Sequence, residues 1–73
     1  MKEVDVRGYI CSQATFLTRR AFLENKSNEA VSVTGHGPAV LESLERVGEK
    51  YGYRAEKTNL PDNDFCIVFT KKG

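Results

Sequence analysis

The sequence lacks an excess of charge of either sign. Eleven basic and ten acidic residues are mixed along its 73 positions and give a formal net charge of +1. Proteins that attract a phosphate backbone over a long range carry a clustered positive charge. The near balance therefore argues against nucleic acid as the main partner.

Long apolar runs are also absent. No segment approaches the ~20 apolar residues that span a bilayer, and Met1-Lys2-Glu3 is not followed by the apolar core of a signal peptide. We therefore expect a cytoplasmic protein with no membrane partner. The length predicts one domain, residues 1–73, whose small core leaves a thin margin of stability.

Cysteine is scarce, with Cys11 and Cys66 as its only occurrences. They do not form a C-x-x-C pair, and a cytosolic chain is kept reduced, so we expect two free thiols. No second cysteine or histidine lies at the spacing of metal ligands. The sequence therefore predicts neither a metal site nor a cofactor.

Periodicity in the sequence predicts six elements. Two-residue alternation indicates strands, and apolar residues three and four apart indicate amphipathic helices. Proline suits the first position of a helix, and glycine suits the residue after its end. The predicted elements are a strand over 3–7, a helix over 13–25, a strand over 30–34, a helix over 38–51 and strands over 53–58 and 65–70. A polar turn is predicted over 26–29, between the first helix and the second strand.

This β-α-β-α-β-β order predicts an α+β two-layer sandwich. The first two strands are expected to be parallel through a right-handed crossover and the last two to form a hairpin, giving a four-stranded mixed sheet with both helices on one face. Phe65, Ile67 and Phe69 should point toward the helices, which places Cys66 on the open face. Phe16 and Leu23 are expected either to join a wide core or to form a docking stripe for a partner.

Chemistry is expected at the edge of the sheet where the two parallel strands end. There the turn before Cys11 and the turn around His36 should be neighbours. Unpaired N–H groups and the dipole at a helix start favour a thiolate, so Cys11 is a candidate nucleophile. The alternative is that Cys11 is a small buried hydrophobic residue at an ordinary turn.

Two other polar residues lie near this edge. His36 could act as a base or stabilise a thiolate, but no carboxylate is evidently placed to orient it, and a histidine between glycines is also typical of an exposed loop. Arg7 could pair with a thiolate, a persulfide or an acidic partner surface. Alternatively, it forms a salt bridge at the strand end with Asp5 or Glu56.

The pattern Asp-x-Arg-Gly-x-x-Cys, formed by Asp5, Arg7, Gly8 and Cys11, resembles the signature of the TusA/SirA-like family of small sulfur carriers. The resemblance covers essentially the whole chain in length, element order and motif position. It implies that Cys11 carries a persulfide from a cysteine desulfurase-like or rhodanese-like donor protein to an acceptor protein.

The chain departs from this family immediately after the cysteine. The family signature continues Cys-Pro-x-Pro, whereas Ser12 and Ala14 occupy the two proline positions here. A serine can cap a helix by itself, which would place Cys11 one residue outside the helix. The alternative function is therefore a regulatory or protein-binding module that kept the fold and lost the carrier chemistry.

Overall fold

The computed structural model describes residues 1–25 and 29–72. The elements in this part of the chain are β1 (Lys2–Asp5), α1 (Cys11–Glu24), β2 (Val31–His36), α2 (Pro38–Lys50), β3 (Tyr53–Asn59), a 3-10 turn (Pro61–Asn63) and β4 (Asp64–Lys71). The predicted order of elements is confirmed. The polar turn predicted over 26–29 lies, apart from Glu29, outside the described residues.

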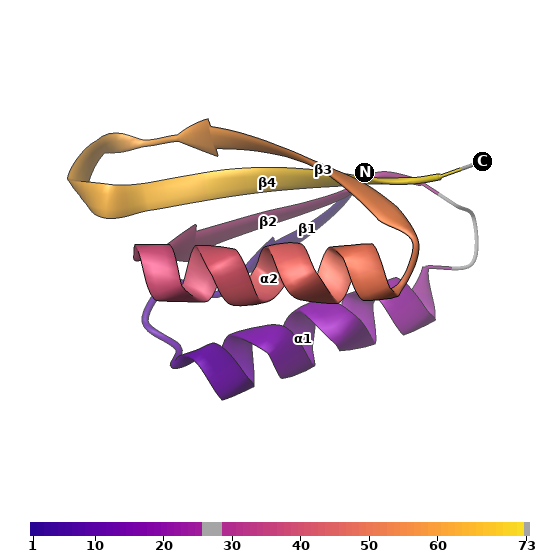
Figure 1. Ribbon diagram of the computed structural model, residues 1–73, viewed down its shortest axis with the longest axis horizontal. Coiled ribbons are helices and arrows are strands. Elements are labelled where there is room, and N and C mark those ends of the chain that lie inside the picture. The colour runs from indigo at the N-terminus through magenta and orange to yellow at the C-terminus, as the bar shows by residue number, and fades with distance from the viewer. Residues whose placement is uncertain (26–28, 73) are drawn as a thin grey trace.

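The four strands form one mixed sheet in the order β1-β2-β4-β3. β1 and β2 are parallel, and β4 is antiparallel to both β2 and β3. Both helices cover the same face of this sheet and leave the other face open (Figure 1). The structure is therefore the predicted two-layer sandwich, with β4 in its interior and β1 and β3 at its edges.

Alternation along the two central strands places their apolar residues in the core. Val33 on β2 is paired with Ile67 on β4, and both are fully buried. Phe65 and Phe69 lie two residues to either side of Ile67 and are also buried, as the alternation predicts. Cys66 points to the open face and is half-buried.

Aromatic rings connect the helices to the sheet. Phe22 on α1 stacks on Tyr53 with ring centroids 4.2 Å apart and meets Phe69 edge to face at 5.0 Å. On the other side of the core, Gly48 brings the backbone of α2 against the Phe69 ring, where a Cβ atom would overlap the ring. The core is therefore centred on Phe69, between one aromatic residue and one glycine.

Phe16 and Leu23 do not join this core. Their side chains are 52% and 66% exposed, so the expectation that a wide core takes them in is wrong. The buried face of α1 consists of Ala14, Thr18, Ala21 and Phe22. Phe16 follows Ala14 by two residues and so points about 200° away around the helix. These two apolar residues remain available to a partner.

Candidate functional site

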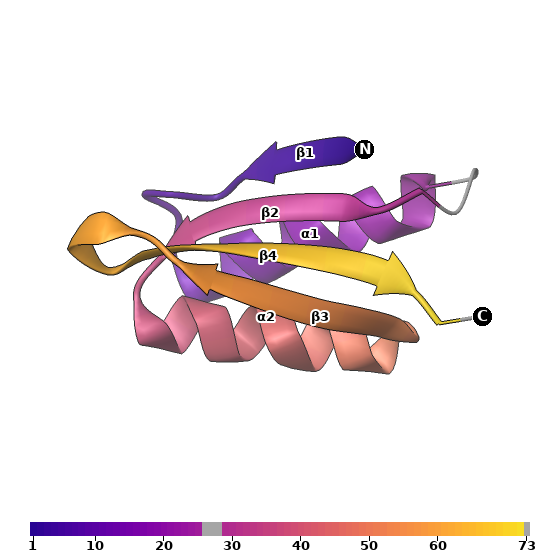
Figure 2. The same cartoon turned by 90° about the horizontal axis from the view of Figure 1, so that it is seen from above.

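Three connections meet at one end of the sheet. The β1–α1 loop, the β2–α2 connection and the β3–β4 turn lie together there (Figure 2). Both helices begin at this end, because each follows a strand that runs toward it (Figure 1). The expected convergence of the two helix starts is therefore confirmed.

Gly8 shapes the loop that leads to Cys11. The backbone N–H of Tyr9 donates to the carbonyl of Val6 at 3.2 Å and closes a tight turn. Gly8 occupies the third position of this turn with a φ of +86°, which a residue with a Cβ atom adopts only with strain. The glycine of the motif thus reverses the chain between β1 and α1.

Cys11 is the first residue of α1, and Ile10 precedes the helix as its N-cap. The helix therefore begins two residues earlier than predicted. The alternative in which Ser12 caps the helix does not hold, because Ser12 lies inside the first turn, where its carbonyl accepts a hydrogen bond from the Thr15 hydroxyl at 3.0 Å. Cys11 consequently stays inside the helix although the motif prolines are absent.

The first turn of α1 is open to an anion. Among the described residues, no side chain caps it and no acidic residue lies within it. The first N–H groups of a helix have no partner within the helix, so those of Cys11 and its neighbours carry an uncompensated partial positive charge. The start of α1 is therefore an electrostatically favourable place for an anion.

Cys11 is half-buried and packs against the core, whereas exposed apolar residues flank it in sequence. Tyr9 and Ile10 immediately before it are 47% and 65% exposed, and Phe16 follows one turn later. A depression of about 280 Å³ at the start of α1 is lined by Tyr9, Ser12, Gln13, Phe16 and Leu17, and Cys11 is not part of its lining. Sequence reasoning missed Tyr9 and Ile10 as surface residues, and their apolar character so close to a thiol is the signal that could have identified them.

Four charged or titratable side chains form a chain of contacts at the same end of the sheet. The Arg7 guanidinium donates to both carboxylate oxygens of Asp5, at 2.9 and 3.1 Å, and lies 3.9 Å from Asp64. The other carboxylate oxygen of Asp64 lies 2.7 Å from His36 Nδ1. His36 and Asp64 are partners in the β2–β4 register, which fixes this pair.

Two expectations about this end of the sheet require correction. A carboxylate does orient His36, namely Asp64, which the sequence had assigned only to a turn. Arg7 pairs with Asp5 as one alternative predicted, and its second partner is Asp64 and not Glu56. Glu56 belongs to β3, at the opposite edge of the sheet from β1, so it is too distant for Arg7.

Asp5 makes the stability of the protein depend on pH. Hydrogen bonds from the side chain and backbone of Arg7 lower the pKa of Asp5 to about 2. A carboxylate whose pKa is lower in the folded state stabilises that state above its unfolded pKa of about 3.9, and this contribution disappears as the pH falls through the folded value.

We expect the urea midpoint to fall between pH about 4 and 2, and to fall less in Asp5→Asn. Glu56→Gln, which removes a carboxylate at the far edge of the sheet, should leave the change of the urea midpoint with pH as it is in the wild type. If Glu56→Gln reduced this change as much as Asp5→Asn, the pH dependence could not be assigned to Asp5.

Cys66 lies away from this edge. Its Sγ is 3.3 Å from the Ser32 hydroxyl on the open face of the sheet. Both cysteines are free thiols.

Within residues 1–25 and 29–72, no three His, Cys, Asp or Glu side chains gather in a group able to hold a metal ion. In the same ranges, no helix has the length and apolar character needed to cross a membrane.

Comparison with known proteins identifies the architecture. No protein-family model matches the sequence, and no curated protein matches it. The structure superimposes on the crystal structure of a SirA-like protein from Desulfitobacterium hafniense with a TM-score of 0.89, and both chains are covered completely. The fold is SirA-like. The two sequences are 18% identical, so the likeness is one of fold.

Proposed function

We propose that the protein is a small sulfur carrier in which Cys11 holds sulfane sulfur as a persulfide and relays it between proteins. The observation that carries this proposal is the position of Cys11, as the first residue of an uncapped helix, in a SirA-like fold. Arg7 and Gly8 both shape the loop before Cys11. The Arg7 guanidinium donates to the Asp5 carboxylate at the end of β1, and Gly8 forms the turn with its positive φ. His36 and Ser12 complete the supporting set at this end of the molecule.

The chemistry requires no cofactor. The Cys11 thiolate attacks the outer sulfur of a donor's persulfide, a new S–S bond forms as the donor's S–S bond breaks, and the donor leaves as a thiolate. The acceptor's thiolate then attacks the outer sulfur on Cys11 in the same way. Neither step changes the total oxidation state, so the protein's task is to favour the thiolate and to present it.

The test is sulfur loading of the purified protein. Incubation with a cysteine desulfurase and cysteine should add about 32 Da, one sulfur atom, to the intact mass. Dithiothreitol should remove this adduct, whereas a sulfinic acid of nearly equal mass would resist reduction. Cys66→Ser should load like the wild type and Cys11→Ser should not. A wild-type protein that stays unmodified beside a loaded control carrier would refute the proposal.

A binding or regulatory module is the second candidate function. It is favoured by the exposure of Phe16 and Leu23 on α1, which play no part in the core. In this case the fold serves to hold a partner and Cys11 has the reactivity of an ordinary thiol. The reactivity of Cys11 therefore distinguishes the two candidates.

A further inference from the structure

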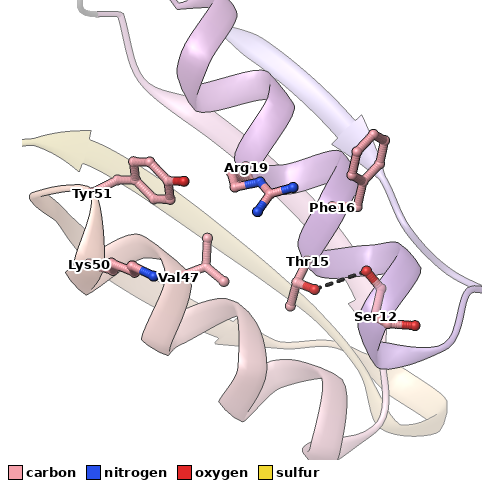
Figure 3. A pocket seen from close by; sticks show the side chains of 7 residues that line it. All are labelled: Ser12, Thr15, Phe16, Arg19, Val47, Lys50 and Tyr51. Carbon is pink, nitrogen blue, oxygen red and sulfur yellow. Dashed lines mark hydrogen bonds between the residues drawn. The ribbon is translucent and has the colours of Figure 1, made fainter.

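A groove runs between the two helices on the side of the molecule away from the sheet. Its volume is about 290 Å³. Figure 3 shows side chains from both helices lining it: Ser12, Phe16 and Arg19 on α1, Val47 and Lys50 on α2, and Tyr51 directly after the end of α2. Ser12 directly follows Cys11, so the groove reaches the same first turn of α1 that carries the proposed carrier thiol.

The charges of this groove are not balanced. The two helices carry four cations, of which Arg20 and Arg46 each pair with a glutamate four residues away on their own helix. The other two, Arg19 and Lys50, line the groove, and the described residues provide neither with a carboxylate within ion-pair distance. An occupant with negative charge would complement both.

Apolar surface accompanies these cations. The Arg19 guanidinium carbon lies 5.7 Å from the centre of the exposed Phe16 ring, which holds the cation at the groove. Val47 on α2 and Tyr51 directly after its end are partly buried against the core and form an apolar wall of the groove. A cationic groove with an apolar wall fits a peptide that combines carboxylates with a large apolar side chain.

We propose that this groove binds an acidic segment of the protein that exchanges sulfur with Cys11. Its carboxylates would pair with Arg19 and Lys50, and an apolar side chain would contact Val47 and Tyr51. The inference rests on the proposed function in taking a protein as the occupant. Docking at this groove would hold the partner's reactive sulfur near the start of α1.

Peptide binding to the full chain tests this inference. The probe is the acetylated peptide Glu-Glu-Leu-Phe-Glu-Glu, titrated into 15N-labelled protein and followed through the backbone amide signals. We expect the largest shifts within residues 12–19 and 47–51. Arg19→Gln combined with Lys50→Gln should weaken binding about fivefold to tenfold, because two charge contacts are lost. The peptide Lys-Lys-Leu-Phe-Lys-Lys should bind more weakly than the acidic one.

The matched control is Arg20→Gln combined with Arg46→Gln. It removes the same charge from the same helices outside the groove and should bind the acidic peptide like the wild type. Equal loss in both double variants, shifts centred elsewhere or equal binding of the lysine peptide would overturn the proposal. Cys11→Ser should still bind. If the peptide binds at the groove but Cys11 never takes up sulfur, the carrier function is refuted and the groove proposal stands. If Cys11 takes up sulfur but the peptide does not bind at the groove, the groove proposal is refuted and the carrier function stands.

Discussion

Phe69→Ala should leave most of the protein unfolded at room temperature. Phe69 is fully buried in the central strand β4, where its ring contacts Phe22 and the backbone at Gly48. Removal of a buried phenylalanine side chain costs about 3–5 kcal/mol. A core in a chain of this size supplies a net stability of the same order. The variant should therefore lose its cooperative urea transition, measured by circular dichroism.

The neighbouring residue Val68 provides the control for this prediction. It lies on the same strand but points to the open face, where it is half-buried. Val68→Ala should lower the free energy of unfolding by about 1 kcal/mol or less, because that face of the sheet has no covering layer. If Phe69→Ala kept a transition close to that of Val68→Ala, the core could not be centred on Phe69.

The layers of this fold could be predicted because local periodicity determines them. Alternation in β2 and β4 predicts that Val31, Val33 and Ile67 point inward, and all three are buried. Pro38 begins α2 as predicted, since a proline at the first helical position sacrifices no hydrogen bond. These signals depend on residues close in sequence and therefore survive without knowledge of the tertiary contacts.

The order of the strands was not predicted, although composition contains a signal for it. β4 alternates large apolar residues and lies between β2 and β3, whereas β3 has Tyr53 as its single buried residue and lies at an edge. A strand with a polar sequence loses little at an edge, where one side lacks a neighbour. Placement of β4 beside β2 brings Asp64 opposite His36, a contact between residues 28 positions apart.

The start of α1 was predicted two residues late because the usual signal is missing. A side-chain cap marks many helix starts, but Ile10 provides only backbone groups here. Ser12 resembles a cap in sequence and yet lies within the first turn. The sequence therefore placed Cys11 at the junction of strand and helix, but whether it lies inside the helix depended on backbone geometry and could not be read from residue preferences.

In the folded protein, Cys11 should react with iodoacetamide several-fold faster than Cys66 at neutral pH. Cys11 begins an uncapped helix without an acidic residue in its first turn, so unpaired backbone N–H groups and the positive end of the helix dipole lie at the residue that carries the thiol. Cys66 lies within a central strand and its Sγ contacts the Ser32 hydroxyl, with no such field. The two rates are measured separately by intact mass in Cys66→Ser and Cys11→Ser.

The same two variants in guanidinium chloride separate the effect of the fold from that of the local sequence. Unfolding abolishes the helix dipole and exposes both thiols, so the two rates should become nearly equal. A ratio near one in the folded protein as well would mean that the start of α1 does not activate Cys11, and would favour the binding module over the carrier. A ratio that persisted in denaturant would place its cause in the flanking residues and not in the helix. Only a ratio that appears on folding ties the reactivity of Cys11 to its position at the first residue of α1.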